Sequence, residues 1–275
     1  MSITAPRYAS APVPLTDRTA RVWAIASREF FRRGTWGPLA AVTITYMAVV
    51  LFVVVSVYLS YIFGDLSTST FGSVYSSPVW PFLILLVAAG VGAGSLADDV
   101  GNRTITLYLS RPIKLDDYVM AKTIACGGWI LIASVGPGLF AVGVVAALGY
   151  ASLTVVGESF LGFLATGLIV AVFFTGFALA LSSLTNRALY AGVAIFGLVL
   201  ATFIGASIVA GITGNAYVPY ANPFVNIESI AHGAFFVPGI AATNPIASAV
   251  VMLGTGVFLW CVASWRMTRV EVVTE

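Results

Sequence analysis

Apolar residues in this chain gather in long runs and do not alternate with polar ones. Six runs each approach or exceed the roughly 20 residues that an α-helix needs to cross a bilayer. They cover about 38–63, 79–97, 122–148, 160–182, 189–211 and 245–265. In lipid, backbone groups must be hydrogen-bonded within the protein, which favours helices over loops or open strands. The pattern predicts an all-α integral membrane protein, with six transmembrane helices in a domain at 36–270.

Composition supports a multi-pass protein of the cell membrane. Of the 275 residues, 59% are hydrophobic and 9% are charged, whereas soluble domains average about 25% charged residues. A soluble fold of this length could not bury so much apolar surface. We therefore expect lipid to surround much of the chain.

The positions of the basic residues predict the topology. All thirteen Lys and Arg lie before the first run, between the second and third runs, between the fourth and fifth runs, or after the sixth run. The other three connections carry only acidic residues and the single histidine, His232. Because cytoplasmic loops are enriched in Lys and Arg, the sequence predicts that the N and C termini are both cytoplasmic.

The segment before the first run divides into two parts. Residues 1–15 are rich in Pro, Ala and Ser and are expected to be a disordered tail. Residues 16–35 predict an amphipathic helix. Its charged residues lie on one side, together with the apolar Ile25, and its aromatic residues lie on the other. Such helices lie in the membrane interface, and the residues expected to act there are Arg21, Trp23, Arg28, Phe30 and Arg32. The alternative is a solvated basic flank of the first span.

The connection at 98–121 has more internal pattern than a linker. A short segment with several apolar residues, 104–109, is followed by Pro112. Asp116 is predicted to be the N-cap of the next helix, and Asp117 in its first turn suits the helix dipole. Exposed apolar residues in a charged loop indicate a surface for a partner.

Two further features concern packing. Gly90 and Gly94 form a small-xxx-small pair in the second span, which predicts a close approach of helices there. The connection at 212–244 contains aromatic residues and prolines. It predicts short helices that lie at or dip into the outer leaflet, the alternative being a loosely ordered loop.

Motifs for catalysis or cofactor binding are missing from the sequence. It has no GxxxxGK[ST] phosphate-binding loop, no HExxH and no GxSxG. Cys126 and Cys261 form no CxxC pair and are expected to be small buried hydrophobic residues. The span interiors carry essentially no ionisable residues, which counts against a self-powered carrier. We therefore expect no catalytic, cofactor or metal site, and energy supplied by another polypeptide.

The connection at 98–121 resembles the inner loop of ABC-transporter permeases of the type-two exporter class. The resemblance rests on an acidic residue, Arg-Thr, a Leu-rich stretch, Ser-Arg-Pro-Ile, a Tyr and a Lys: Asp98 or Asp99, Arg103-Thr104, Leu107 to Leu109, Ser110 to Ile113, Tyr118 and Lys122. The family more often has Glu at the first of these positions and Gly where Arg103 stands. The six spans and Asn222-Pro223 are also similar, so the resemblance covers roughly 16–270.

The resemblance implies a permease subunit of an ATP-driven exporter that is not itself an enzyme. Such permeases pair as homodimers or heterodimers in lipid, and each binds a separate cytoplasmic ATPase that holds ATP and Mg; no nucleic acid is involved. The residues implied to dock on the ATPase are Arg103, Thr104, Leu107, Tyr108, Leu109, Arg111 and Pro112. The alternatives are a self-powered secondary carrier or channel, and a membrane-embedded enzyme or assembly factor. No substrate path is assigned.

Overall fold

A computed structural model describes residues 17–31, 36–63, 67–102, 114–237 and 242–272. Over these ranges every regular element is a helix. In chain order they are α1 (Arg18–Phe30), α2 (Trp36–Phe63), α3 (Thr68–Ser76), α4 (Val79–Gly101), α6 (Leu115–Ala147), α7 (Leu153–Ser183), α8 (Ala188–Thr213), the 3-10 helix η1 (Val218–Ala221), α9 (Pro223–Ala234) and α10 (Pro245–Val272).

Six of these helices, α2, α4, α6, α7, α8 and α10, are long and apolar enough to cross a membrane. The prediction of an all-α protein with six spans is therefore confirmed. The helices extend further than the apolar runs that predicted them: α6 begins at Leu115 and α10 continues to Val272. Helical hydrogen bonding continues into the polar interface, where an apolar run has already ended.

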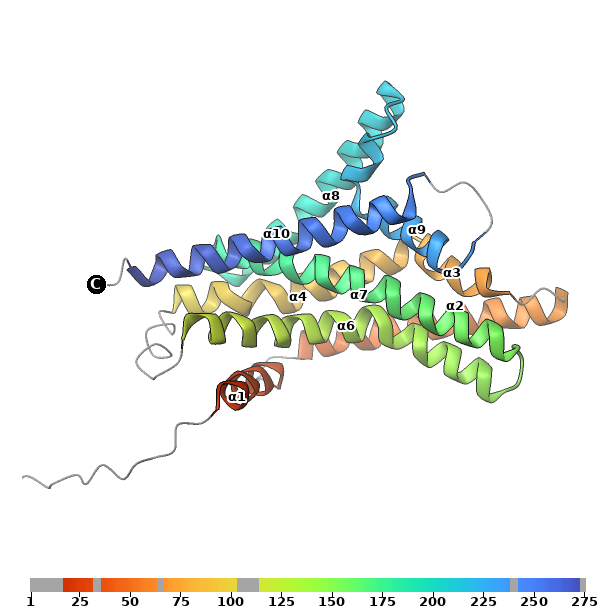
Figure 1. The fold of residues 1–275 in the computed structure, drawn as a ribbon, viewed down its shortest axis with the longest axis horizontal. Coiled ribbons are helices and arrows are strands. Elements are labelled where there is room, and N and C mark those ends of the chain that lie inside the picture. The colour runs from red at the N-terminus through yellow and green to blue at the C-terminus, as the bar shows by residue number, and fades with distance from the viewer. Residues whose placement is uncertain (1–16, 32–35, 64–66, 103–113, 238–241, 273–275) are drawn as a thin grey trace, which may run out of the picture.

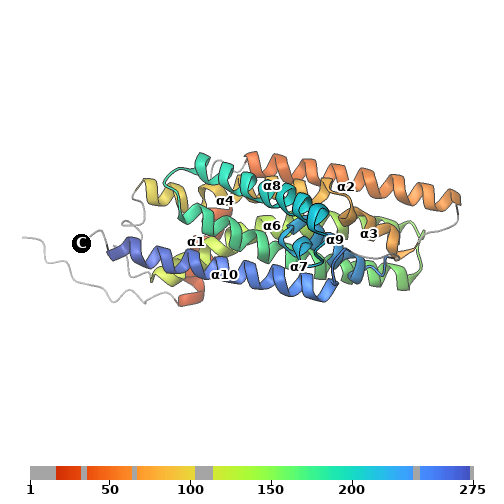
Figure 2. The ribbon, with the colours of Figure 1, turned by 90° about the horizontal axis from the view of Figure 1, so that it is seen from above.

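The long helices form a bundle with α7 at its centre (Figures 1 and 2). Helix α7 packs against α4, α6 and α10, whereas α2 and α10 lie at opposite edges of the bundle in Figure 2. Helix α8 packs against α4 and diverges from the other spans toward its η1 end (Figure 1). Helices α2, α8 and α10 bury few of their residues, so their apolar side chains are available to lipid or to another chain.

Glycines permit the closest contacts of α7, as small residues do in membrane bundles. A Cβ on Gly92 of α4 would overlap Ala178, and a Cβ on Gly176 would overlap the backbone of Gly256 in α10. The predicted pair at Gly90 and Gly94 does not make this approach. A Cβ on Gly90 would meet nothing within 4 Å, and one on Gly94 would first meet the Asp98 side chain of its own helix. The sequence predicted the correct stretch of α4 for a close helix contact, but the contact is made by the face that carries Gly92.

Short helices cover the end of the bundle opposite α1. In the connection at 212–244, η1 and α9 are helical, and Asn222 caps α9 by accepting a hydrogen bond from the Phe224 amide at 3.0 Å. Their depth relative to the outer leaflet stays a prediction. Helix α3 was not predicted, because its Ser- and Thr-rich sequence has no apolar periodicity. It carries Tyr75, whose hydroxyl donates to the Ser134 carbonyl at 2.7 Å and whose pKa is raised by burial.

Candidate functional site

Basic side chains gather at one end of the bundle, which we call the basic end. It comprises α1, the end of α4, the beginning of α6, the turn between α7 and α8, and the end of α10, on the left of Figure 1. The opposite end, which we call the acidic end, includes Glu158 and Glu228. The helices that meet at the basic end bring several charges into buried positions, and these charges form the candidate site.

The first part of the site is centred on Lys122, in the second turn of α6. The side chain is only 2% exposed, and its Nζ lies 2.7 Å from Asp99 Oδ2 on α4 and 3.0 Å from Glu29 Oε2 on α1. Tyr118, one turn earlier on α6, donates its hydroxyl to the same Asp99 oxygen at 2.6 Å. One ammonium group thus joins three helices.

The second part of the site is centred on Asp117, whose side chain is fully buried. Arg18 of α1 donates from Nε to Asp117 Oδ1 at 2.6 Å, and Arg21 Nη2 lies 3.8 Å from Oδ2. Asp117 also lies in the first turn of α6, where the helix dipole stabilises negative charge. The N-terminal half of α1 is therefore attached to the start of α6 by charge.

We call these six charged residues the charge cluster: Arg18, Arg21, Glu29, Asp99, Asp117 and Lys122. Its three cations balance its three carboxylates. Removing one partner of a buried pair destabilises a protein by roughly 3–5 kcal/mol, because the remaining charge stays buried without compensation. The arrangement therefore resists separation of α1, α4 and α6.

Aromatic contacts fix the other end of α1. The Phe30 ring stacks on Trp129 of α6 with centroids 4.6 Å apart and planes 11° apart. Trp129 Nε1 also donates to the Phe30 carbonyl at 3.3 Å, one of the carbonyls that a helix leaves without an intrahelical partner at its C-terminus. Helix α1 is thus held at both ends against α6.

The predicted interfacial residues divide between two faces of α1. Arg21 and Phe30 face α6, whereas Trp23, which is 66% exposed, and Arg28 face away from it. Arg32 lies outside the described residues. Charges that the sequence assigns to the polar side of an interfacial helix therefore partly face the protein. A single sequence does not reveal that the partners of the α1 charges lie on other helices.

The seven predicted docking residues, Arg103, Thr104, Leu107, Tyr108, Leu109, Arg111 and Pro112, lie outside the described part of the chain. The structure does describe both flanks of that segment. It brings Asp99 from one flank into contact with Tyr118 and Lys122 from the other, three residues that also carry the resemblance. Asp99, not Asp98, is the buried acid.

The predicted N-cap of α6 is wrong. Helix α6 begins at Leu115 after Lys114, no side chain caps it, and Asp116 lies within its first turn. The prediction placed the boundary at the most favourable capping residue, but the backbone turns helical earlier. The ion pairs of Arg18, Glu29 and Asp117 were not predicted from the sequence. The available indication was that Asp99, Asp117 and Lys122 border apolar runs, where ionisable residues need partners.

The family assignment follows from a comparison with known proteins. The family model described as ABC-2 family transporter protein matches residues 45–263. This chain belongs to that family. A search of curated proteins finds no match. The matched range reaches from within α2 to within α10, and it contains both flanks of the inner connection.

The assignment makes the chain an ABC-2 permease, a multi-pass membrane component of an ABC transporter. The permease family works with an ABC ATPase in general, and this sequence has no phosphate-binding loop of its own. Helix α1 precedes the matched range. Its ion pairs to Lys122 and Asp117 nevertheless attach it to α6, which lies within that range. The charge cluster joins α1, α4 and α6 through ion pairs.

Proposed function

We propose that this ABC-2 permease is the membrane subunit of an ATP-driven exporter in the cell membrane. A separate cytoplasmic ATPase would bind ATP and Mg and dock at 103–113. The observation that carries the proposal is the charge cluster, which joins α1 to both flanks of that segment through Lys122. The basic end would then be the cytoplasmic end, in keeping with the distribution of Lys and Arg.

The cluster supplies a physical route from the ATPase to the spans. A push on 103–113 would act on the last turn of α4, which contains Asp99, and on the first turn of α6, which contains Asp117. Because Lys122 binds Asp99 and Glu29 together, pulling any one helix away would expose or isolate a buried charge. Helices α1, α4 and α6 would therefore move as one body and pass the displacement to α7.

A second permease copy or a paralogue would complete the transporter. The exposed apolar faces of α2 and α8 support this part of the proposal, because they offer two long surfaces for lipid or for another chain. They include Leu51, Tyr58, Val193 and Ile208, which are each more than half exposed.

The docking proposal is tested by replacing two apolar residues of the inner connection. The variant carrying Leu107→Asp and Tyr108→Asp should lose co-purification with its ABC ATPase partner, because two carboxylates would enter an apolar contact. The matched control is Leu153→Asp, at a side chain 91% exposed at the acidic end, which should leave association unchanged. Undiminished association of the double variant would contradict docking at this segment.

A further inference from the structure

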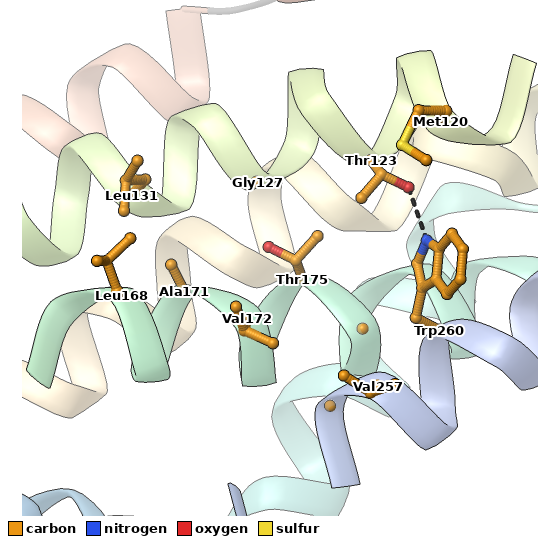
Figure 3. Close-up of a pocket in the computed structure, with 12 residues that line it drawn as sticks. Met120, Thr123, Gly127, Leu131, Leu168, Ala171, Val172, Thr175, Val257 and Trp260 are labelled. Atoms are coloured by element: carbon orange, nitrogen blue, oxygen red, sulfur yellow. Dashed lines mark hydrogen bonds between the residues drawn. The ribbon is translucent and has the colours of Figure 1, made fainter. Parts of the chain in front are cut away.

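A groove opens on the side of the bundle between α6, α7 and α10, and the proposed export cycle assigns it no role. It encloses about 360 Å³, within the roughly 300–1,000 Å³ of typical small-molecule sites. Figure 3 shows side chains from α6 and α7 facing each other across it, with Trp260 of α10 at one end. Apart from two threonines and the indole nitrogen, its walls are apolar: Met120, Thr123, Gly127, Leu131, Leu168, Ala171, Val172, Thr175, Gly176, Gly256, Val257 and Trp260.

Two of the polar groups in the groove satisfy each other. Trp260 Nε1 donates to Thr123 Oγ1 at 2.9 Å, the bond drawn in Figure 3. The Thr123 hydroxyl in turn donates to the Val119 carbonyl at 2.8 Å. This chain of bonds fixes α10 against α6 at one end of the groove and leaves no donor there for a ligand.

Thr175 is different. Its side chain is 5% exposed, it lines the groove, and its Oγ1 has no hydrogen-bond partner among the described residues. The hydroxyl lies opposite Gly127 of α6, where an added Cβ would come within 3.2 Å of Oγ1. A buried hydroxyl without a hydrogen-bond partner is unfavourable, because it has lost its hydrogen bonds to water. An acceptor brought into the groove by a ligand would remove that penalty.

The depth of Thr175 indicates what such a ligand is. Helix α7 has 31 residues and is therefore about 46 Å long, whereas the hydrocarbon core is about 30 Å thick. Thr175 lies eight residues before the end of α7 at Ser183, or about 12 Å along the axis. If α7 is centred in the bilayer, Thr175 lies about 4 Å inside the hydrocarbon boundary at the basic end.

Trp260 lies about one helical turn nearer the basic end than Thr175, since it bonds to Thr123 whereas Thr175 lies opposite Gly127. Tryptophans are common near membrane boundaries. This boundary is where the ester carbonyls of a glycerolipid meet its acyl chains. An ester carbonyl accepts hydrogen bonds and donates none, so it complements the single unpaired hydroxyl of the groove.

We propose that the groove between α6, α7 and α10 is a specific site for one acyl chain of an ester-linked glycerolipid from the leaflet at the basic end. The Thr175 hydroxyl donates to the ester carbonyl, and the chain runs along Leu131, Leu168 and Val172 toward the bilayer centre. Because Thr123 follows Lys122 directly on α6, an occupied groove lies one residue from the charge cluster. The proposal concerns lipid binding only, and its test does not depend on whether an ATPase docks at 103–113.

The test uses two lipids that differ only in the carbonyl. The purified full-length protein is placed in nanodiscs containing a phosphatidylcholine with ester-linked chains or its ether-linked analogue, each carrying the same photoreactive group in the chain. Cross-linked peptides are identified by mass spectrometry, and each probe is competed against the other. Labelling of the groove walls should favour the ester lipid by roughly two- to tenfold, the ratio that one net hydrogen bond supplies.

Two variants decide whether Thr175 is responsible. Thr175→Val keeps the shape of the side chain without the hydroxyl, so it should retain labelling but lose the ester preference. The control is Thr166→Val, on the same helix at a buried threonine outside the groove, which should keep the preference. Gly127→Leu should fill the groove and reduce labelling of its walls, with folding checked by gel filtration.

Three results would overturn the proposal. They are equal labelling by ester and ether lipids in the unmodified protein, an unchanged ester preference in Thr175→Val, and labelling spread evenly over α2 and α8. The last would show only general contact with the bilayer.

Discussion

The two ends of the bundle are held together by different chemistry. At the basic end, α1, α4 and α6 meet through six charged side chains centred on Lys122 and Asp117. At the acidic end, α3, α7 and α9 meet mainly through neutral aromatic side chains, beside one hydrogen bond from Thr68 to Glu158 at 2.8 Å. There Phe163 and the buried Phe235, which follows α9, have ring centroids 4.9 Å apart at 76°, and Tyr75 lies within 6.1 Å of both.

The aromatic contacts depend on close backbone approach as well as on the rings. A Cβ on Gly72 of α3 would lie 2.7 Å from the Phe235 Cβ, and one on Gly162 of α7 would lie 2.8 Å from its ring. Only glycine admits the ring at these two positions. The acidic end is therefore a shape-matched contact that tolerates little displacement.

The difference shows what each end is suited to do. Ion pairs act over distance and keep their partners associated while helices tilt, whereas interlocked rings lose contact after small shifts. The charged end is also the one joined to the segment proposed to meet the ATPase. The comparison predicts that damage to the two ends has different consequences.

The largest effect is expected from Lys122→Met, which removes the cation that binds both Asp99 and Glu29. Two carboxylates would remain close together with little exposure, so the free energy of unfolding should fall by about 3–5 kcal/mol. Chemical unfolding in mixed micelles measures this change. The control is the other lysine, Lys114, which is exposed; Lys114→Met should stay within about 0.5 kcal/mol of the unmodified protein.

A rescue variant sharpens this first prediction. Adding Glu29→Gln and Asp99→Asn to Lys122→Met removes the two carboxylate charges that Lys122 balances and should restore part of the lost stability. If the triple variant is no more stable than the single one, lost packing of the lysine side chain explains the defect, and the electrostatic account of the basic end is wrong.

Phe235→Ala tests the acidic end and should lower the free energy of unfolding by about 3 kcal/mol, because it leaves a ring-sized cavity beside Tyr75 and Phe163. The neighbouring Phe236 is 72% exposed, so Phe236→Ala should have little effect. Helix α1 should keep its hydrogen-exchange protection in both variants. Loss of that protection in Phe235→Ala would mean that the two ends do not behave independently.

The smallest effect is expected from Asp117→Asn, which keeps the shape of the side chain but removes its charge. Weakened contacts to Arg18 and Arg21 should destabilise α1 by about 2 kcal/mol, seen as faster hydrogen exchange in Arg18–Phe30 with little change in α9. Asp116→Asn, at the exposed neighbour, is the control. Equal protection of α1 in both variants would assign its docking to Phe30 and Trp129 instead.

Particular residues show where prediction from the sequence succeeded. Long apolar runs located all six spans, because a lipid-facing helix must be apolar over its whole length. The prolines and aromatic residues of 212–244 predicted short helices, and η1 and α9 lie in that connection. These properties are local, so a stretch of sequence carries them.

Other features depended on contacts between distant residues. Helix α3 has no apolar periodicity, and it is positioned by the buried Tyr75 and its bond to Ser134. The docked face of α1 was assigned to the polar surface because Arg18 and Asp117 are 99 residues apart. The groove at Thr175 likewise needs three helices to form it.

By itself, the sequence determined that the chain is a six-span membrane protein of the ABC-2 type. Hydropathy and a short motif in one connection carry that information, because the bilayer imposes it on each segment separately. Only the tertiary structure decided which charges are buried together, which glycine of α4 admits a neighbour, and which hydroxyl lacks a partner. Those outcomes depend on distances between helices, and a linear pattern does not contain distances. The charge cluster at the basic end is the clearest case, since its parts lie on three helices and become one site only where those helices meet.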